Sequence, residues 1–139
     1  MELYFDSEEF KNSSTYKNFI NINSGKGILR VEASTASEAY PLKEVEVIIS
    51  KKLDGNKIIF YKGVTNDSGI IDGIILPTRG MNSEVEDASD ILFTTYDLEA
   101  KYPKYGLEKM YDVSIFDDVK VIQPITFPVT DLIEGEQNE

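Results

Sequence analysis

The sequence predicts an all-β protein: a single antiparallel seven-stranded β-sandwich over residues 27–130, preceded by an N-terminal arm. Three observations favour this fold. Apolar and polar side chains alternate with a period of two after residue 26, turn residues recur at nearly regular intervals, and the stretch from Gly63 to Pro77 joins two strands through a tight turn. In that turn Asn66 and Ser68 can hydrogen-bond their own backbone, and Gly69 can adopt a positive φ without steric cost.

Length and composition indicate one folded domain and exclude several kinds of catalytic site and partner. The chain has 139 residues, of which 41% are hydrophobic, and this suits a single core. It contains no histidine and no cysteine, so the commonest general base, the commonest zinc ligands and the thiol nucleophile are missing. The formal charge of −11 repels phosphate backbones and anionic membrane surfaces. We therefore expect no nucleic acid and no membrane as partner.

Residues 1–26 form an arm whose aromatic side chains follow a loosely helical spacing. So much aromatic surface favours burial against a protein surface. The arm either packs on its own domain or docks on another subunit, and the sequence leaves both interpretations open. The apolar side chains available for either contact are Leu3, Tyr4, Phe5, Phe10, Tyr16, Phe19 and Ile20.

The first four strands are expected between residues 27 and 76. Every other residue is apolar in 27–34 and again in 45–49, which predicts two half-buried strands. Asp54-Gly55-Asn56 is a hairpin signal, after which residues 57–64 return as the third strand. The β-branched stretch 70–76 supplies the fourth strand, which Pro77 ends.

Three further strands are expected after a polar loop. The loop runs from Pro77 to Asp90, and the strands follow over 91–102, 110–116 and 119–127. The last two strands are joined at Asp117-Asp118. Residues 131–139 form a polar C-terminal tail.

Several short motifs follow one another in a characteristic order between residues 27 and 128: Pro41-Leu42 before Val45 and Val47, the turn 65–69, Leu76-Pro77, Tyr96-x-Leu98, Ile115-Phe116-Asp117-Asp118 and Val121-Ile122-Gln123-Pro124. This order resembles the transthyretin-like, or carboxypeptidase regulatory-like, sandwich, and in particular the domain of this type in clostridial spore cortex-lytic enzymes. The resemblance implies a transthyretin (prealbumin)-like fold. It carries no activity over, because the peptidase domain of those enzymes is missing here. Hydroxyisourate hydrolases share the transthyretin fold but rely on histidines, which this chain lacks.

Carboxylates are the only abundant reactive groups. Two clusters are candidates for calcium, which accepts irregular oxygen ligands, although solvated turn carboxylates are the simpler interpretation of both. Asp97 and Glu99 are the nearest suggestion of a glycosidase acid pair, but no substrate groove is visible in the sequence. We therefore expect no cofactor, no metal and no catalytic residue. The two clusters are Asp112, Asp117 and Asp118 near a strand end, and Glu84, Glu86, Asp87 and Asp90 in the polar loop.

Aromatic residues of the second half of the chain have two interpretations. They form either a carbohydrate-binding platform or the core of the sandwich, and the period of two favours the core. In the bend 102–106 we expect Tyr102 and Tyr105 to be exposed as a contact patch. The aromatic residues in question are Phe93, Tyr96, Tyr102, Tyr105, Tyr111 and Phe116.

These patterns predict a non-catalytic structural or interaction module, not an enzyme, working within a larger assembly such as a phage-tail-like particle or a spore structure. The partner is a protein or a second copy, engaged through the arm. The alternative is a peptidoglycan- or glycan-binding accessory domain, and a small carboxylate hydrolase comes third. Because residues 1–20 begin with acidic residues, we expect cytoplasmic synthesis without a signal peptide, with a virion, tail particle or spore as the final location.

Overall fold

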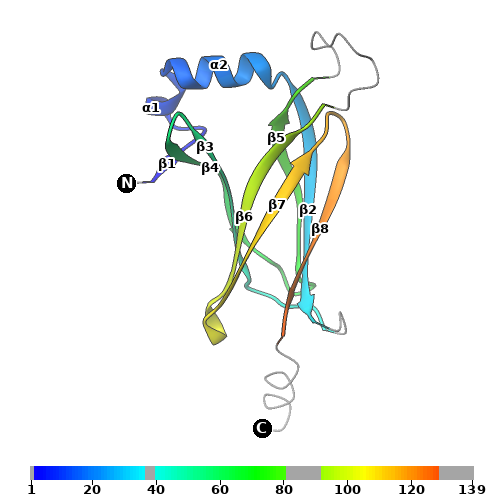
Figure 1. Ribbon diagram of the computed structural model, residues 1–139. Coiled ribbons are helices and arrows are strands. Elements are labelled where there is room, and N and C mark those ends of the chain that lie inside the picture. The colour runs from blue at the N-terminus through cyan, green and yellow to red at the C-terminus, as the bar shows by residue number, and fades with distance from the viewer. Residues whose placement is uncertain (1, 37–39, 81–91, 129–139) are drawn as a thin grey trace, which may run out of the picture.

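The computed structural model describes residues 2–36, 40–80 and 92–128, which form a two-layered β-sandwich (Figure 1). One layer is a five-stranded sheet with the order β1-β4-β3-β6-β7, and the other is a three-stranded sheet with the order β5-β2-β8. The strands are β1 (Leu3–Tyr4), β2 (Gly25–Thr35), β3 (Glu46–Leu53), β4 (Asn56–Val64), β5 (Ile70–Thr78), β6 (Thr94–Tyr102), β7 (Leu107–Ile115) and β8 (Lys120–Phe127). The helices are α1 (Glu8–Lys11), α2 (Ser14–Ile22) and the 3₁₀ turn Pro103–Tyr105.

The predicted all-β sandwich is confirmed, with two differences in its sheets. The arm adds a short strand, β1, which brings the described strands to eight and pairs with β4 in parallel. The second difference is that β8 runs parallel to β2. The short turn at Asp117-Asp118 carries the chain from the five-stranded sheet into the three-stranded one, so β7 and β8 do not form a hairpin.

The core lies between the two sheets and is made by the alternate residues that the period of two predicts. In β6 every second residue from Thr94 to Tyr102 is buried, and in β2 the same holds from Gly27 to Thr35. Burial of such side chains is the main stabilising term of a domain of this size. The fully buried side chains of the core include Leu29, Val31, Val47, Ile49, Tyr96, Leu98, Ile115 and Ile125.

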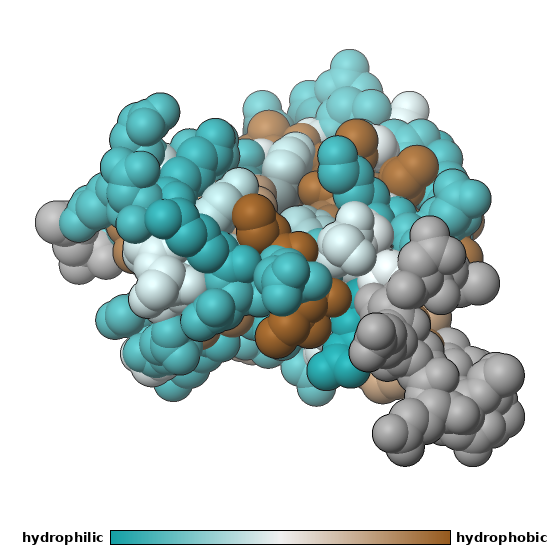
Figure 2. All heavy atoms as spheres, turned by 90° about the horizontal axis from the view of Figure 1, so that it is seen from above, coloured by the Kyte–Doolittle hydropathy of each residue, from teal (hydrophilic) through white to brown (hydrophobic). Residues whose placement is uncertain are grey.

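The arm packs on its own sandwich. Each of its helices has a serine as N-cap, Ser7 for α1 and Ser13 for α2. The side-chain oxygen of each serine accepts a hydrogen bond from the backbone N–H three residues later. The ring of Phe5 stacks on that of Phe60 in β4 at 4.4 Å, and the ring of Phe19 lies 5.5 Å from the same ring. From above, at the end where the helices lie, hydrophobic residues form small separate groups among hydrophilic ones (Figure 2).

Both predicted turns have the expected backbone. Asp54 and Gly55 have φ values of 50° and 81°, which a tight two-residue hairpin of mirror-image type requires. The side-chain oxygen of Asn66 accepts hydrogen bonds from the N–H groups of Ser68 and Ile70. Gly69 has a φ of 75°, and a Cβ at this position would overlap the carbonyl oxygen of Ala33. The prediction of a positive φ at Gly69 is therefore confirmed.

Candidate functional site

The outer surface of the three-stranded sheet carries both apolar and charged side chains, and no helix in the described ranges 2–36, 40–80 and 92–128 covers it (Figure 1). In Figure 1 the helices lie at the upper end of the sandwich and beside β3 and β4, so that neither α1 nor α2 lies over this surface. Three of its isoleucines are accordingly exposed, by 62% at Ile75, 54% at Ile122 and 39% at Ile28. We call it the open face and define it by the outward residues Lys26, Ile28, Arg30 and Glu32 of β2, Ile70, Asp72 and Ile75 of β5, and Lys120, Ile122 and Pro124 of β8.

The strand registers set the pattern of the open face. Ile28 of the central strand β2 lies between Ile75 of β5 and Lys120 of β8. Two residues further along β2, Arg30 lies beside Ile122 of β8. Gly73 has a φ of 74°, and the β2–β5 register shifts between Leu29 and Val31, opposite this glycine. Apolar and charged groups are therefore neighbours both across the sheet and along its strands.

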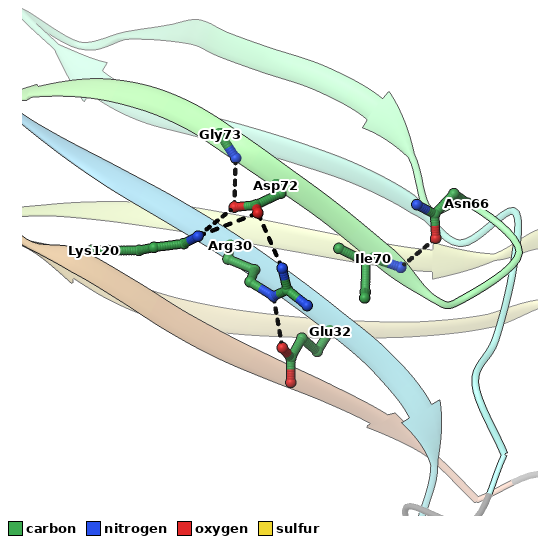
Figure 3. A network of polar contacts seen from close by, with 7 residues as sticks. All are labelled: Arg30, Glu32, Asn66, Ile70, Asp72, Gly73 and Lys120. Carbon is green, nitrogen blue, oxygen red and sulfur yellow. Dashed lines mark hydrogen bonds and ion pairs between the residues drawn. The ribbon is translucent and has the colours of Figure 1, made fainter.

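An ion cluster occupies the middle of the open face (Figure 3). Asp72 accepts a hydrogen bond from Arg30 Nη1 at 3.0 Å, and Lys120 Nζ reaches across β2 to lie 3.1 Å from Asp72 Oδ1. Arg30 Nε donates to Glu32 Oε2 at 2.7 Å. The hydrogen bond from Lys120, followed by those from the Gly73 backbone and Arg30, holds the pKa of Asp72 below its ordinary value, although desolvation opposes the shift.

The cluster matters because of the charge of the rest of the chain. The open face carries three cations, Lys26, Arg30 and Lys120, against two carboxylates, Glu32 and Asp72. The whole chain has a formal charge of −11. The open face therefore carries a formal excess of one positive charge, in contrast to the strongly acidic chain as a whole.

A shallow hollow of about 320 Å³ continues the open face at its lower end. Glu32 and Ile70 of the open face line it, together with Ser34 of β2 and Ser68 of the turn. Pro41 and Pro124 complete its walls. It offers a recess with hydroxyl groups next to apolar surface, which is the mixture that small-molecule sites commonly show.

The sequence analysis missed the open face, although the sequence contains a signal for it. Strands β5 and β8 carry apolar residues at consecutive positions, such as Ile74-Ile75 and Val121-Ile122. Successive strand residues point to opposite sides, so one residue of each pair must face outward. A strand that is apolar on both sides predicts a covering partner on its outer side.

The predicted partner-binding residues of the arm contact the chain's own sandwich. Phe10 and Phe19 are buried, while Tyr4, Phe5 and Tyr16 are partly buried. The ring of Phe5 also lies 5.2 Å from that of Tyr16 and 5.9 Å from that of Phe10. A partner would have to displace these contacts in order to use the same rings.

The predicted exposure of both tyrosines in the bend 102–106 is wrong for Tyr102. Tyr102 is buried because it shares the inward side of β6 with Tyr96 and Leu98, and its ring packs on that of Phe127. Tyr105 is partly buried, with its ring 5.4 Å from that of Tyr102. These tyrosines extend the core and do not form a carbohydrate platform in this conformation.

The carboxylate clusters do not form a metal site among the residues that the structure describes, where no group of three or more Asp and Glu side chains converges. The loop cluster 84–90 lies outside the described residues. Asp117 accepts a hydrogen bond from the backbone N–H of Lys26 at 3.1 Å, so it stabilises a turn. Asp97 and Glu99 share the outer side of β6, where Asp97 lies directly opposite Asp112.

The described sandwich is similar to solved structures of transthyretin-like proteins. Solved structures similar to it include 5-hydroxyisourate hydrolase from Klebsiella pneumoniae (18% identity, TM-score 0.45, 72% of this chain and 90% of that chain). They also include (S)-allantoin synthase (11%, TM-score 0.48, 76% and 42%) and transthyretin from Sparus aurata (19%, TM-score 0.40, 70% and 87%). No protein-family model and no curated protein sequence matches the chain.

These neighbours correct the predicted function. The prediction of a non-catalytic structural or interaction module, and with it the statement that the chain is not an enzyme, is contradicted because two of the neighbouring structures are enzymes. The exclusion rested on missing histidine and cysteine, which removes only some kinds of catalysis. A chain of this fold is not excluded from catalysis. Among the described residues, no helix is long and apolar enough to cross a membrane.

Proposed function

We propose that the chain binds an organic anion with an apolar body, and that the open face is the binding site. The observation that carries the proposal is the combination of exposed isoleucines with unequal charge. Ile28, Ile75 and Ile122 offer apolar contact, and Lys26, Arg30 and Lys120 outnumber the carboxylates beside them. A ligand of this class removes apolar surface from water and places its anionic group near the cations.

The ion cluster supports this choice of ligand class. Asp72 and Glu32 hold Arg30 through its Nε and Nη1 atoms, which fixes the guanidinium against the sheet. Within the described part of the chain, Lys120 pairs with Asp72. Fixed cations bind an anion with less loss of side-chain freedom than mobile ones. The carboxylates thus orient the cations, and the excess positive charge remains for a ligand.

The proposal is tested with 1-anilinonaphthalene-8-sulfonate, a fluorescent organic anion with an aromatic body. We expect saturable fluorescence enhancement with the folded full chain, and binding of the uncharged N-phenyl-1-naphthylamine about tenfold weaker, since a paired charge is worth about 1 kcal/mol or more at a partly desolvated site. Ile122→Thr keeps a β-branched residue in β8 but removes apolar contact. Lys120→Gln removes one cation. Each is expected to weaken binding about three- to tenfold.

The matched control is Met110→Thr. Met110 is 66% exposed in β7, on the outer side of the other sheet, so its replacement removes a similar apolar contact away from the open face. It should leave dye binding unchanged. Dye binding that Met110→Thr weakens as much as Ile122→Thr would contradict the proposal, as would equal affinity for the charged and uncharged dyes.

The finer resemblance of the sequence, to the domain in clostridial spore cortex-lytic enzymes, stays a prediction. Its support is the motif order between Pro41 and Pro124. A solved structure of that domain with the same sheet order and the same parallel β2–β8 pair would favour it.

A further inference from the structure

We infer that the open face of one copy docks on an acidic surface of a second copy, so that copies associate head to tail. This inference rests on the proposed function. The acidic surface of the second copy, with its exposed apolar side chain, takes the place of the organic anion that the open face is proposed to bind. It is carried by the charges of the two outer surfaces of the sandwich. These surfaces belong to different sheets and lie on opposite sides of the molecule.

The second surface is the outer side of β6 and β7, which we call the acidic face. It carries four carboxylates and one lysine, whereas the open face carries two carboxylates and three cations. Like the open face, it also includes an exposed apolar side chain, Met110. The outward residues of the acidic face are Thr95, Asp97, Glu99, Lys101, Glu108, Met110, Asp112 and Ser114.

One carboxylate pair on the acidic face is poorly compensated. Asp97 and Asp112 lie directly opposite each other on neighbouring strands, an arrangement in which like charges repel. Glu99 is paired with Lys57 at 2.6 Å, but among the described residues no ion pair joins a cation to Asp97 or Asp112. A cationic surface placed over this pair would relieve the repulsion, and the open face is such a surface.

The direction of docking follows from the same charges. Two acidic faces repel each other, and two open faces each carry a net positive charge. Docking of an open face on an acidic face joins surfaces of opposite charge and covers the isoleucines of one copy with Met110 of the other. Such a contact is heterologous, since it leaves one free open face and one free acidic face at the ends.

The test is sedimentation velocity of the full chain over a range of concentrations. We expect association that grows with concentration, forms species larger than dimers and weakens as salt is raised, because salt screens charges beyond about 8–10 Å. Ile122→Glu on the open face and Asp112→Lys on the acidic face should each weaken the association constant about tenfold, since like charges then meet across the contact. Glu9→Lys, in α1 and on neither face, is the charge-reversal control and should weaken nothing.

Mixing distinguishes head-to-tail docking from a symmetric dimer. Each variant supplies the face that the other has lost, so an equimolar mixture of the Ile122→Glu and Asp112→Lys proteins should form a one-to-one pair more tightly than either variant associates alone. Unchanged association of Asp112→Lys alone, or a full-chain protein that sediments as a monomer or stops at a dimer, would overturn the inference.

The two proposals fail differently. Asp112→Lys lies away from the open face, so it should keep full binding of 1-anilinonaphthalene-8-sulfonate while losing association. Excess dye should also dissociate copies of the unaltered chain. Dye binding without association overturns only the head-to-tail contact, whereas loss of specific dye binding at the open face overturns the proposed function as well.

Discussion

Replacing Phe19 by alanine tests whether the arm is an integral part of the folded domain. The side chain of Phe19 is only 6% exposed, its ring lies 5.7 Å from that of Phe5, edge to face, and 5.5 Å from that of Phe60. A buried phenylalanine replaced by alanine typically costs about 3–5 kcal/mol. For a domain of this size each 1 kcal/mol corresponds to roughly 3–4 °C, so Tm should fall by about 10–20 °C.

The matched control is Ile22→Ala in the same helix. Ile22 is 51% exposed, so its replacement removes much less buried surface than the replacement of Phe19. It should cost less than about 1 kcal/mol. Both variants gain a similar amount from the higher helix propensity of alanine, which therefore cancels in the comparison. Thermal unfolding followed by circular dichroism measures both. Equal Tm values for Phe19→Ala and Ile22→Ala would refute the packing of the arm on its own sandwich.

Three further outcomes are expected. Gly69→Ala should lower the urea midpoint more than Gly73→Ala: both glycines have φ near 75°, but only at Gly69 does a Cβ meet backbone, and equal midpoints would contradict this account. Tyr96→Phe should cost about 1–2 kcal/mol in chemical unfolding because the carbonyl of Pro77 loses its buried donor, whereas Tyr4→Phe, at an exposed hydroxyl, should cost almost nothing. Asp72→Asn should lower Tm at pH 6 but not at pH 2, because the pKa of Asp72 is lowered in the folded state. The ionised carboxylate therefore stabilises the fold above the unfolded pKa of about 3.9, and this contribution is lost as the pH falls through the lower folded pKa.

The strands and turns could be predicted because their signals are local. Alternation marked β2 and β6 correctly, and the Asp54-Gly55 and Asn66–Gly69 turns follow from the backbone preferences of glycine and asparagine. Pairing is not local. The turn at Asp117-Asp118 has the length of a hairpin, yet it joins strands of different sheets, and no local signal separates these two outcomes.

The candidate site was harder to predict because its exposure depends on where the other elements pack, and local sequence does not fix this. Arg30 and Asp72 are 42 residues apart, and only the antiparallel pairing of β2 with β5 brings them to 3.0 Å. The bend suggests that Tyr102 is exposed, although its spacing of two residues from Ala100 and four from Leu98 already places it on the buried side of β6. Aromatic spacing alone does not say which surface buries the arm, so the sequence leaves both interpretations of it open.

Amide NMR mapping is the most direct test of whether the open face binds an organic anion. In a ¹H–¹⁵N spectrum of the full chain titrated with 1-anilinonaphthalene-8-sulfonate, the largest shifts should fall at Ile28, Arg30, Asp72, Ile75 and Ile122, with little change in β6 and β7. The side-chain Nε–H signal of Arg30 should shift with the same affinity. Shifts concentrated in the helices or on β6 and β7, or no saturable shifts on β2, β5 and β8, would contradict the assignment of the open face as the binding site.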